Sequence, residues 1–259
     1  MIQCVLTPAA GKRLIAKAIQ AHAAVQTALQ TGTVVIVAGT TNGYVAEEIL
    51  RSLGQSKDFV RNRFFRGITL PHSFAVTESG RLPDESKFPG DVILVNGTWQ
   101  KGETIFDVVD GLKEGDVILK GANAVDLLNR RAGILIGHPK GGTIVAAIQA
   151  VVGRRVRLIL PVGVEKRVSA SLDVLAAKLN DPRNQGPRFL PVSGEIVTEL
   201  DALAQLTGCA AEISAGGGVC GAEGAVWVAA SGDSAQEQAA RKLLDAVSAE
   251  EPFDLFSES

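Results

Sequence analysis

Short apolar runs alternate with helical patterns over the first two thirds of the chain. Short, mostly apolar runs occupy residues 34–38, 92–95, 117–119, 133–136 and 156–161, and such runs are typical of strands buried on both faces of a sheet. Between them, helices are predicted at 11–31, 44–53, 104–112 and 144–152, on apolar spacing and on the turn residues that bound them. This alternation indicates a doubly wound parallel sheet of the Rossmann-like α/β class.

The last third of the chain has a different order of elements. A loop rich in Pro, Asn, Gly and Arg at 181–187 predicts a domain boundary. Beyond it the pattern predicts strands at 189–192, 210–214 and 225–230 and helices at 195–206 and 235–247. The order β-α-β-β-α indicates a small ferredoxin-like α+β sandwich. We therefore expect an α/β domain at 1–187 and a small domain at 188–259 with a loose tail, whose Phe253, Leu255 and Phe256 are candidates for docking on a partner surface.

Residues 55–90 are less regular, and we interpret them as strands joined by loops that could form a flap. Arg61, Arg63 and Arg66 interleave there with Phe64 and Phe65. Such a segment can clamp a phosphate or stack on a base. The pattern fits a solvated strand face better.

Composition narrows the class of protein. Apolar residues make up 46% of the 259 residues, and 26 basic against 28 acidic residues give a formal charge of −2, which argues against a nucleic-acid coat or a polybasic membrane anchor. The apolar stretch 132–152 is broken by His138, Pro139 and Lys140 and does not read as a membrane span. Three widely spaced cysteines and a start without a signal-peptide pattern predict a cytoplasmic protein.

Three polar loops that follow predicted strands are the candidate site. Their glycines let backbone N–H groups approach a ligand closely, and two of the loops precede predicted helices, whose N-termini attract anions. Thr and Asn can equally cap helices, and Gly can simply make turns. The candidate ligand-binding residues are Thr40, Thr41, Asn42, Gly43, Lys120, Gly121, Ala122, Asn123, His138, Lys140, Gly141, Gly142 and Thr143.

Catalytic candidates within these loops are few. Lys120, His138 and Lys140 carry groups that could act on a ligand, although a lone histidine is more often structural or exposed. The three histidines have no metal-ligand spacing, so the sequence predicts no metal and no cofactor. The glycine-rich segment 216–224 lacks the ending of a phosphate loop and is followed by a strand, which favours a hairpin turn.

Several of these segments resemble the superfamily of ribose-5-phosphate isomerase, glucosamine-6-phosphate deaminase and the CoA transferases. The segment 12–54, with its Gly-Thr-Thr-Asn-Gly turn, is similar to the opening of the isomerase, where such a turn binds the sugar phosphate. Residues 116–126 resemble its Asp-x-x-x-Asp-Gly-Ala-Asp-Glu-x-Asp segment, 140–142 resemble its Lys-Gly-Gly-Gly loop, and 157–166 resemble the strand and basic turn that follow.

The departures from that family concern its acids. Its two acidic loop positions fall on Lys120 and Asn123, its next glutamate on Ala124, and its catalytic glutamate on Ala147 or Gln149. None of these residues is a carboxylate base. Only Lys140 and Asp126 match, so the resemblance implies the fold and an anion site without the isomerase acids.

Three hypotheses about function follow, and the sequence leaves open whether the chain is an enzyme. The first is a cleft at the carboxyl ends of the strands that binds a phosphorylated sugar, a nucleotide-like molecule or an acidic metabolite, with isomerase-like turnover as an option. The second is a non-catalytic metabolite sensor or assembly subunit, which would form a homo-oligomer. The third is a CoA transferase-like enzyme, although Glu165 stands in a different motif from that family's nucleophile. The expected partner is a small anionic metabolite, with no nucleic acid and no membrane.

Overall fold

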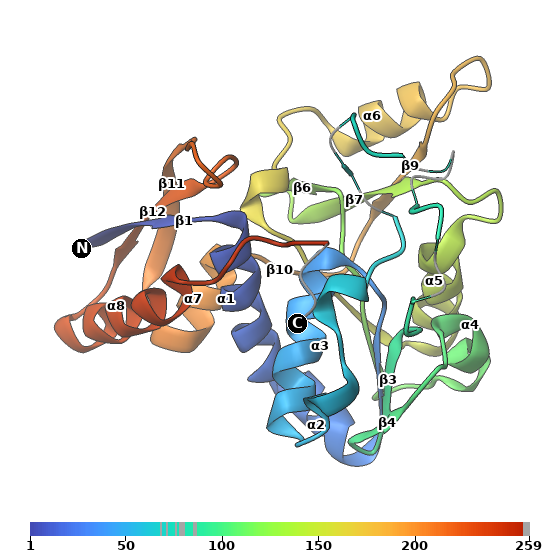
Figure 1. The fold of residues 1–259 in the computed structure, drawn as a ribbon, viewed down its shortest axis with the longest axis horizontal. Helices are drawn as coiled ribbons and strands as arrows, with labels where there is room; N and C mark the ends of the chain where they lie inside the picture. Colours follow the sequence, from blue (N-terminus) through green and yellow to red (C-terminus); the bar gives the residue numbers. More distant parts are fainter. Residues whose placement is uncertain (68, 71, 76, 78–80, 85–86, 256–259) are drawn as a thin grey trace.

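A six-stranded, mostly parallel sheet forms the centre of the fold (Figure 1). The computed structural model describes residues 1–67, 69–70, 72–75, 77, 81–84 and 87–255. The sheet has the order β10-β8-β5-β2-β3-β4. The first four strands pair parallel with one another, and β3 pairs antiparallel with both β2 and β4. Its strands are β2 (Thr33–Ile36), β3 (Val92–Val95), β4 (Thr98–Gln100), β5 (Val117–Leu119), β8 (Arg157–Pro161) and β10 (Glu195–Val197). The predicted α/β class is confirmed at this level.

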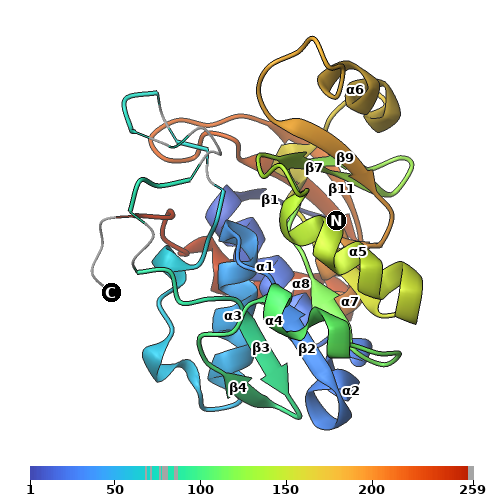
Figure 2. The ribbon, with the colours of Figure 1, turned by 90° about the vertical axis from the view of Figure 1, so that its right-hand side faces the viewer.

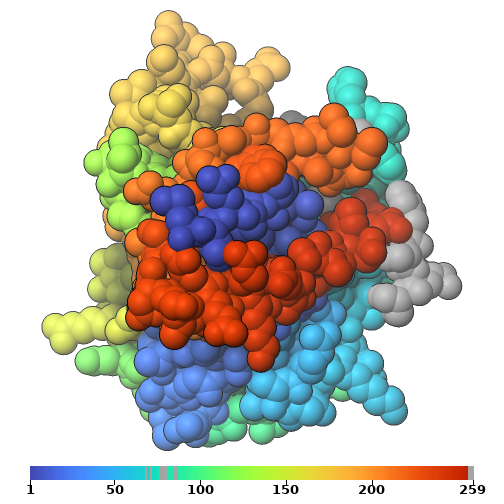
Figure 3. All heavy atoms as spheres, turned by 90° about the vertical axis from the view of Figure 1, so that its left-hand side faces the viewer, coloured from blue at the N-terminus to red at the C-terminus, as the bar shows by residue number. Residues whose placement is uncertain are grey.

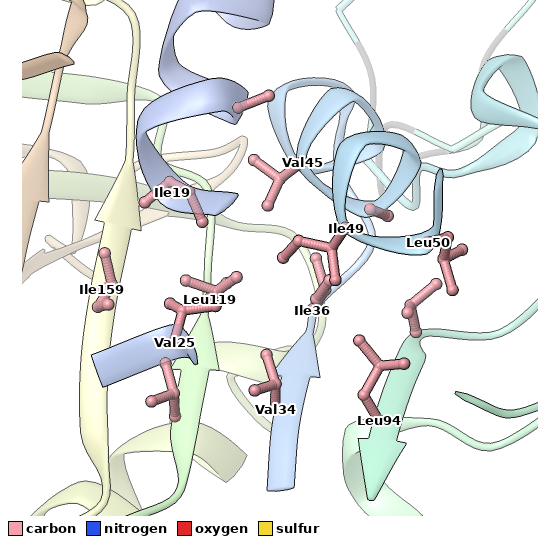
Figure 4. Packing of buried hydrophobic residues seen from close by; sticks show 14 of the residues in the cluster. Ile19, Val25, Val34, Ile36, Val45, Ile49, Leu50, Leu94, Leu119 and Ile159 are labelled. Carbon is pink, nitrogen blue, oxygen red and sulfur yellow. The ribbon is translucent and has the colours of Figure 1, made fainter. Parts of the chain in front are cut away.

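Helices cover both faces of this sheet, because its strands are apolar on both sides. Val34 and Ile36 of β2 pack in a cluster with α1 (Pro8–Gln20), α2 (Ala23–Thr31) and α3 (Thr40–Ser52), as Figure 4 shows. Val35 and Val37 point the other way, toward α4 (Ile105–Val108) and α5 (Gly142–Arg154). Figure 2, turned by 90°, looks at the molecule from the side of α4 and α5. Because helices cover both faces, residues 34–36 of β2 are all apolar.

A second sheet corrects two of the sequence predictions. The order β6-β7-β9 is antiparallel and joins β6 (Ala124–Asp126), β7 (Arg131–Ile136) and β9 (Arg188–Val192). Residues 133–136, predicted in the parallel sheet, and 189–192, predicted in the small C-terminal domain, are therefore partners here. Gly133 makes the pairing fit, because a Cβ at this position would lie 2.0 Å from Cζ of Phe189. Helix α6 (Leu172–Leu179) packs on Phe189.

The third sheet joins the two ends of the sequence. Strand β1 (Ile2–Leu6) pairs antiparallel with β12 (Val226–Ser231), which pairs with β11 (Ala210–Gly216). Figure 3 shows the N-terminal segment in blue between C-terminal segments in orange and red. Helices α7 (Glu199–Thr207) and α8 (Ser234–Ser248) pack against this sheet together with α1. The strand pairing differs from the predicted ferredoxin-like sandwich. The strand predicted first in that sandwich, β9, lies in the second sheet, and β1 from the other end of the sequence pairs with β12 here.

Several predicted elements change type or break. The predicted helix 195–206 begins with strand β10, and α7 starts after Thr198. The predicted helix 11–31 is two helices with a break at Ala21 and His22. Within 55–90 the described residues form no strand. They contain the 3₁₀ turns η1 (Ser56–Asp58) and η2 (Arg61–Arg63), so the strand interpretation of the arginine segment is wrong. Two further 3₁₀ turns are η3 (Val109–Gly111) and η4 (Val164–Lys166).

Residues 249–255 run back from α8 across α1 and α3 (Figure 1). Glu250 forms ion pairs with Arg13 at 2.8 Å and with Arg61 at 2.6 Å, and both guanidinium groups stack on the ring of Tyr44. Arg13, which is only 6% exposed, also pairs with Glu47 and Glu48. The tail predicted as loose is 252–259; within it Phe253 packs on Phe65 and Leu255 is buried, whereas Phe256 lies outside the described residues.

Candidate functional site

The three predicted polar loops meet at one cavity of about 850 Å³. The connection after β2 leads to α3 on one face of the sheet, whereas the chain after β5 reaches α5 on the opposite face. Open parallel sheets place ligands where neighbouring connections diverge in this way. The predicted residues that line the cavity are Thr40, Thr41, Lys120, Gly121, Ala122, Asn123, His138, Gly141, Gly142 and Thr143.

The other three predicted ligand-binding residues lie outside this lining. Asn42 is fully buried, and its Nδ2 donates to the carbonyl oxygens of Val37 at 2.7 Å and Leu119 at 2.9 Å. It therefore holds the ends of β2 and β5 together beneath the cavity. Gly43 packs closely on Arg61, because a Cβ there would lie 3.0 Å from Cγ of that arginine. Lys140 is exposed and is not part of the lining.

Two helix N-termini open into the cavity without side-chain caps. Helix α3 begins after Gly39 and α5 after Gly141, and neither residue has a side chain that could accept from the first N–H groups. Gly141 has a φ of 79°, a conformation that other residues adopt at a cost. Beside the start of α3, the Oγ1 of Thr41 is buried without a hydrogen-bond partner. Both starts present unsatisfied donors and the positive end of a helix dipole.

The lining is strongly basic although the whole chain carries a formal charge of −2. Among the described residues it contains five cationic side chains, Lys12, Arg66, Arg81, Lys120 and Lys166, and one carboxylate, Asp254. Of these, Lys120 was predicted as a site residue, and Arg66 was predicted within a segment that could clamp a phosphate. Lys12 lies on a helix and Lys166 in η4, at positions that only the packing of distant segments brings together, so the sequence carried no local signal for them.

The lysines stand close enough to repel one another. Desolvation and the charge of Lys166 lower the pKa of Lys12, against the opposing effect of Glu165 and Glu199. Desolvation also lowers the pKa of Lys120 to about 8, and Arg66 and Lys166 add to this, whereas Asp91 opposes it. The cavity therefore holds several positive charges close together, and an anion would relieve their repulsion.

A buried aspartate holds Arg66 at the cavity wall. Asp91 accepts from the backbone N–H groups of Ala38 at 2.9 Å and Ile105 at 2.8 Å, and Arg66 donates to it at 3.0 Å. The guanidinium also lies 4.7 Å from the ring centroid of Phe88. Asp91 thus ties the end of β2 to Arg66, and its oxygens are occupied by these donors.

Two glutamates lie behind the lysines and outside the lining. Burial and the neighbouring Glu165 raise the pKa of Glu199 to about 8, while its Oε2 accepts from the N–H of Val164 at 2.8 Å. Glu165 has its Oε1 4.0 Å from Nζ of Lys166. Neither carboxylate reaches the cavity surface, so the position of Glu165 gives the CoA-transferase hypothesis no exposed nucleophile.

His138 and Asn123 form the rim near α5. Nδ1 of His138 accepts from the N–H of Lys140 at 3.2 Å, which leaves Nε2 as the ring nitrogen that a ligand can reach. Oδ1 of Asn123 accepts from the N–H of Leu135 at 3.0 Å. Both side chains are exposed and line the cavity.

The C-terminal segment supplies part of the wall, which the sequence analysis did not foresee. Phe253, Asp254 and Leu255 line the cavity, and the ring of Phe253 meets that of Phe65 edge-on at 5.9 Å. Leu255 is 8% exposed. With Phe106 these side chains give the basic cavity an apolar border.

The two residues that match the isomerase motif, Asp126 and Lys140, both lie outside the lining. Asp126 accepts from the N–H groups of Leu128 and Asn129 and closes the turn between β6 and β7. Comparisons with protein-family models, with curated proteins and with solved structures find no match to this chain. The family resemblance therefore stays a prediction.

Among the residues that the structure describes, no three histidine, cysteine or acidic side chains come together as a metal site. None of the described helices has the length and apolarity needed to cross a bilayer. All three cysteines are free thiols, with Cys209 buried and Cys220 exposed.

Proposed function

We propose that the chain binds a small anionic metabolite, with a phosphate or a comparable dianionic group at the start of α3. The observation that carries this proposal is that two uncapped helix N-termini and five cationic side chains line the same cavity. Helix N-termini and ammonium or guanidinium groups are the elements that proteins use to hold phosphates. The buried, unpartnered hydroxyl of Thr41 supplies a further donor at that position.

The size and border of the cavity indicate the rest of the ligand. A volume of about 850 Å³ is near the upper end of the range of roughly 300–1,000 Å³ found for ligand pockets, and larger than a phosphate group alone requires. Phe106, Phe253 and Leu255 offer an apolar border to the part that carries no charge. A phosphorylated sugar, a nucleotide-like molecule or another acidic metabolite meets these conditions.

Binding is better supported than isomerisation by a carboxylate base. The positions at which the isomerase family has its acids hold Lys120, Asn123, Ala124 and Ala147 or Gln149. Asp254 is the one carboxylate among the described lining residues, and it comes from the C-terminal segment. The proposed function is therefore anion binding, and the lysines of the lining are the groups that could react with the ligand.

The test compares anion binding with stability in Lys12→Met. Methionine keeps much of the length of the lysine stem and removes a charge that is already disfavoured by burial and by Lys166. We expect the affinity for the best ligand of a panel of inorganic phosphate, sugar phosphates, nucleotides, CoA esters and dicarboxylates to fall about 10- to 100-fold, as for a lost charged hydrogen bond. Without ligand the variant should unfold at the same temperature as the wild type or higher.

Matched controls separate the site from general charge effects. Lys178→Met removes an exposed lysine on α6, and Lys140→Met removes the exposed lysine before α5. Both should change affinity less than threefold in calorimetric titrations. If no member of the panel binds the wild type, or if Lys178→Met weakens binding as much as Lys12→Met, the proposal is wrong.

A further inference from the structure

Lys120 is placed differently from Lys166, the lysine of the cavity that has a carboxylate beside it. It follows β5 directly, is half-buried and lines the cavity. Its Nζ donates to the carbonyl oxygen of Gly121 at 3.3 Å and forms no ion pair with a carboxylate of the described chain. Lys166 by contrast has Glu165 beside it. A neutral amine that donates one N–H to a carbonyl keeps its lone pair free.

The charged surroundings of Lys120 favour this neutral form. Arg66 and Lys166 act on it from two different segments, and desolvation disfavours its ammonium form, so its pKa is lowered to about 8. Asp91 is the acid whose charge acts on it, and the oxygens of Asp91 are already engaged by Arg66 and by two backbone N–H groups. Desolvation together with neighbouring cations is the arrangement that makes a lysine nucleophilic.

The topology places this amine next to the anion site. β5 and β2 are adjacent parallel strands, with Leu119 opposite Ile36. Lys120 therefore stands at the strand end that neighbours the start of α3. An anion held at that helix start directs the remainder of its molecule toward the ends of the neighbouring strands.

We propose that Lys120 forms an imine with an aldehyde or ketone group of an anionic ligand whose charge lies at the start of α3. The ligand class is a phosphorylated or carboxylated carbonyl compound. The nitrogen lone pair attacks the carbonyl carbon, the carbon–oxygen bond breaks, and the oxygen leaves as water with the two protons of the amine. One amine and one carbonyl give one imine and one water, so no oxidant or reductant takes part.

This inference rests on the proposed function, because the anion site brings the carbonyl group to the lysine. Pyridoxal 5′-phosphate is a suitable probe, since it joins an aldehyde and a phosphate on one ring. The full chain is incubated with the probe, the imines are reduced with borohydride, and the modified lysines are identified by peptide mass spectrometry. We expect Lys120 to be modified at least about tenfold faster than the exposed Lys140 and Lys178, and inorganic phosphate to slow its modification.

Two further compounds separate this inference from the proposed function. Pyridoxal, which lacks the phosphate, should modify Lys120 at least about tenfold more slowly than the phosphate ester does. Pyridoxine 5′-phosphate, which has an alcohol in place of the aldehyde, measures anion binding alone in a calorimetric titration. If it binds while pyridoxal 5′-phosphate modifies all lysines at similar rates, or modifies Lys12 in preference, the imine proposal is wrong and the anion site stands.

The variant Lys120→Arg completes the test. Arginine keeps the positive charge and forms no such imine, so the site-specific modification should disappear while pyridoxine 5′-phosphate still binds within about tenfold of the wild type. If Lys12 or Lys166 of the Lys120→Arg variant is modified as fast as Lys120 of the wild type, the assignment to Lys120 is wrong. If neither phosphate ester binds the wild type, both proposals fail together.

Discussion

Helices α3 and α5 begin in a different way from helices α7 and α8. The first pair starts after glycine, without a side-chain cap, at the wall of the cavity. The second pair starts with reciprocal capping boxes, in which Thr198 and Asp201 close α7, and Asp233 and Gln236 close α8. A capping box satisfies N–H groups that would otherwise need water or a ligand. Among these four helices, the two that start at the cavity wall are open and the two that start away from it are closed.

The lack of a cap is not sufficient to mark a site. Helices α2 and α6 also start without a side-chain cap, and neither lines the cavity. What distinguishes α3 and α5 is that their starts share one cavity with Lys12, Arg66, Lys120 and Lys166. An uncapped helix start therefore indicates an anion site only where cationic side chains lie beside it.

The largest change in phosphate-ester affinity is expected when a carboxylate is introduced at the uncapped start of α3. In Thr40→Asp the new side chain stands at the first residue of α3, where it supplies the negative charge that the site lacks. Phosphate-ester affinity should fall at least about 100-fold, which corresponds to about 2.7 kcal/mol. The ligand-free protein should gain about 0.5–1 kcal/mol from the helix dipole. Calorimetric titration and thermal unfolding measure the two effects.

A matched substitution away from the cavity is Ser171→Asp at the start of α6. It adds the same charge to another uncapped helix and should leave phosphate-ester affinity within about threefold of the wild type. Loss of affinity in both variants would show that net charge, and not the open start of α3, governs binding.

The second prediction concerns the pH dependence of stability that comes from Glu199, at the capped start of α7. The folded protein raises the pKa of Glu199 above its ordinary value of 4.5, so between about pH 4.5 and 8 the folded state binds more protons than the unfolded state. Stability from this group is complete below that range and is lost as the pH rises through it. Glu199→Gln keeps an acceptor for the N–H of Val164 and removes the titration.

We expect Glu199→Gln to match the wild type near pH 4.5 and to exceed its unfolding temperature increasingly toward pH 8. Each kcal/mol corresponds to about 2–4 °C for a protein of this size. Thermal unfolding across this pH range measures the difference. A variant that is no more stable than the wild type at pH 8 would contradict the burial of an ionised carboxylate at this position.

The smallest effect is expected at the closed start of α8. Asp233 accepts from the N–H of Gln236 at 2.9 Å, and Asp233→Ala removes that cap. The loss should cost about 1 kcal/mol and leave phosphate-ester affinity unchanged. Chemical denaturation and titration of the same preparation test both halves. A threefold or greater loss of affinity would mean that the two classes of helix start are coupled.

The strands at the centre of the sheet could be predicted because their residues face apolar helices on both sides. The predicted 117–119 coincides with β5, and 34–38 and 156–161 contain most of β2 and β8. Partner choice could not be predicted, because β7 is as apolar as its neighbours and its place depends on Gly133 receiving the ring of Phe189. The boundary between β10 and α7 was missed, although Thr198 and Asp201 spell a capping box in the sequence.

The polar loops were found because glycine and threonine after an apolar run are a local signal. The basic character of the cavity was found only in part. Lys12, Lys166 and the segment around Phe253 are far apart in sequence, and tertiary packing alone brings them to one wall. Asn42 illustrates the opposite error, since its position in a polar loop suggested a ligand contact and its amide instead joins β2 to β5.

The pairing of β1 with β12 also means that β1 is synthesised well before the strand it pairs with. During synthesis the first strand leaves the ribosome long before its partner Val226–Ser231 exists, and Arg13 emerges more than 200 residues ahead of Glu250. Contacts between such distant segments are slow to form. Leu6 and Leu14 pack in the same cluster as Val226 and Leu244, so this part of their burial waits for the later segments. Residues 2–14 therefore lack these partners until residues 226–250 have been made.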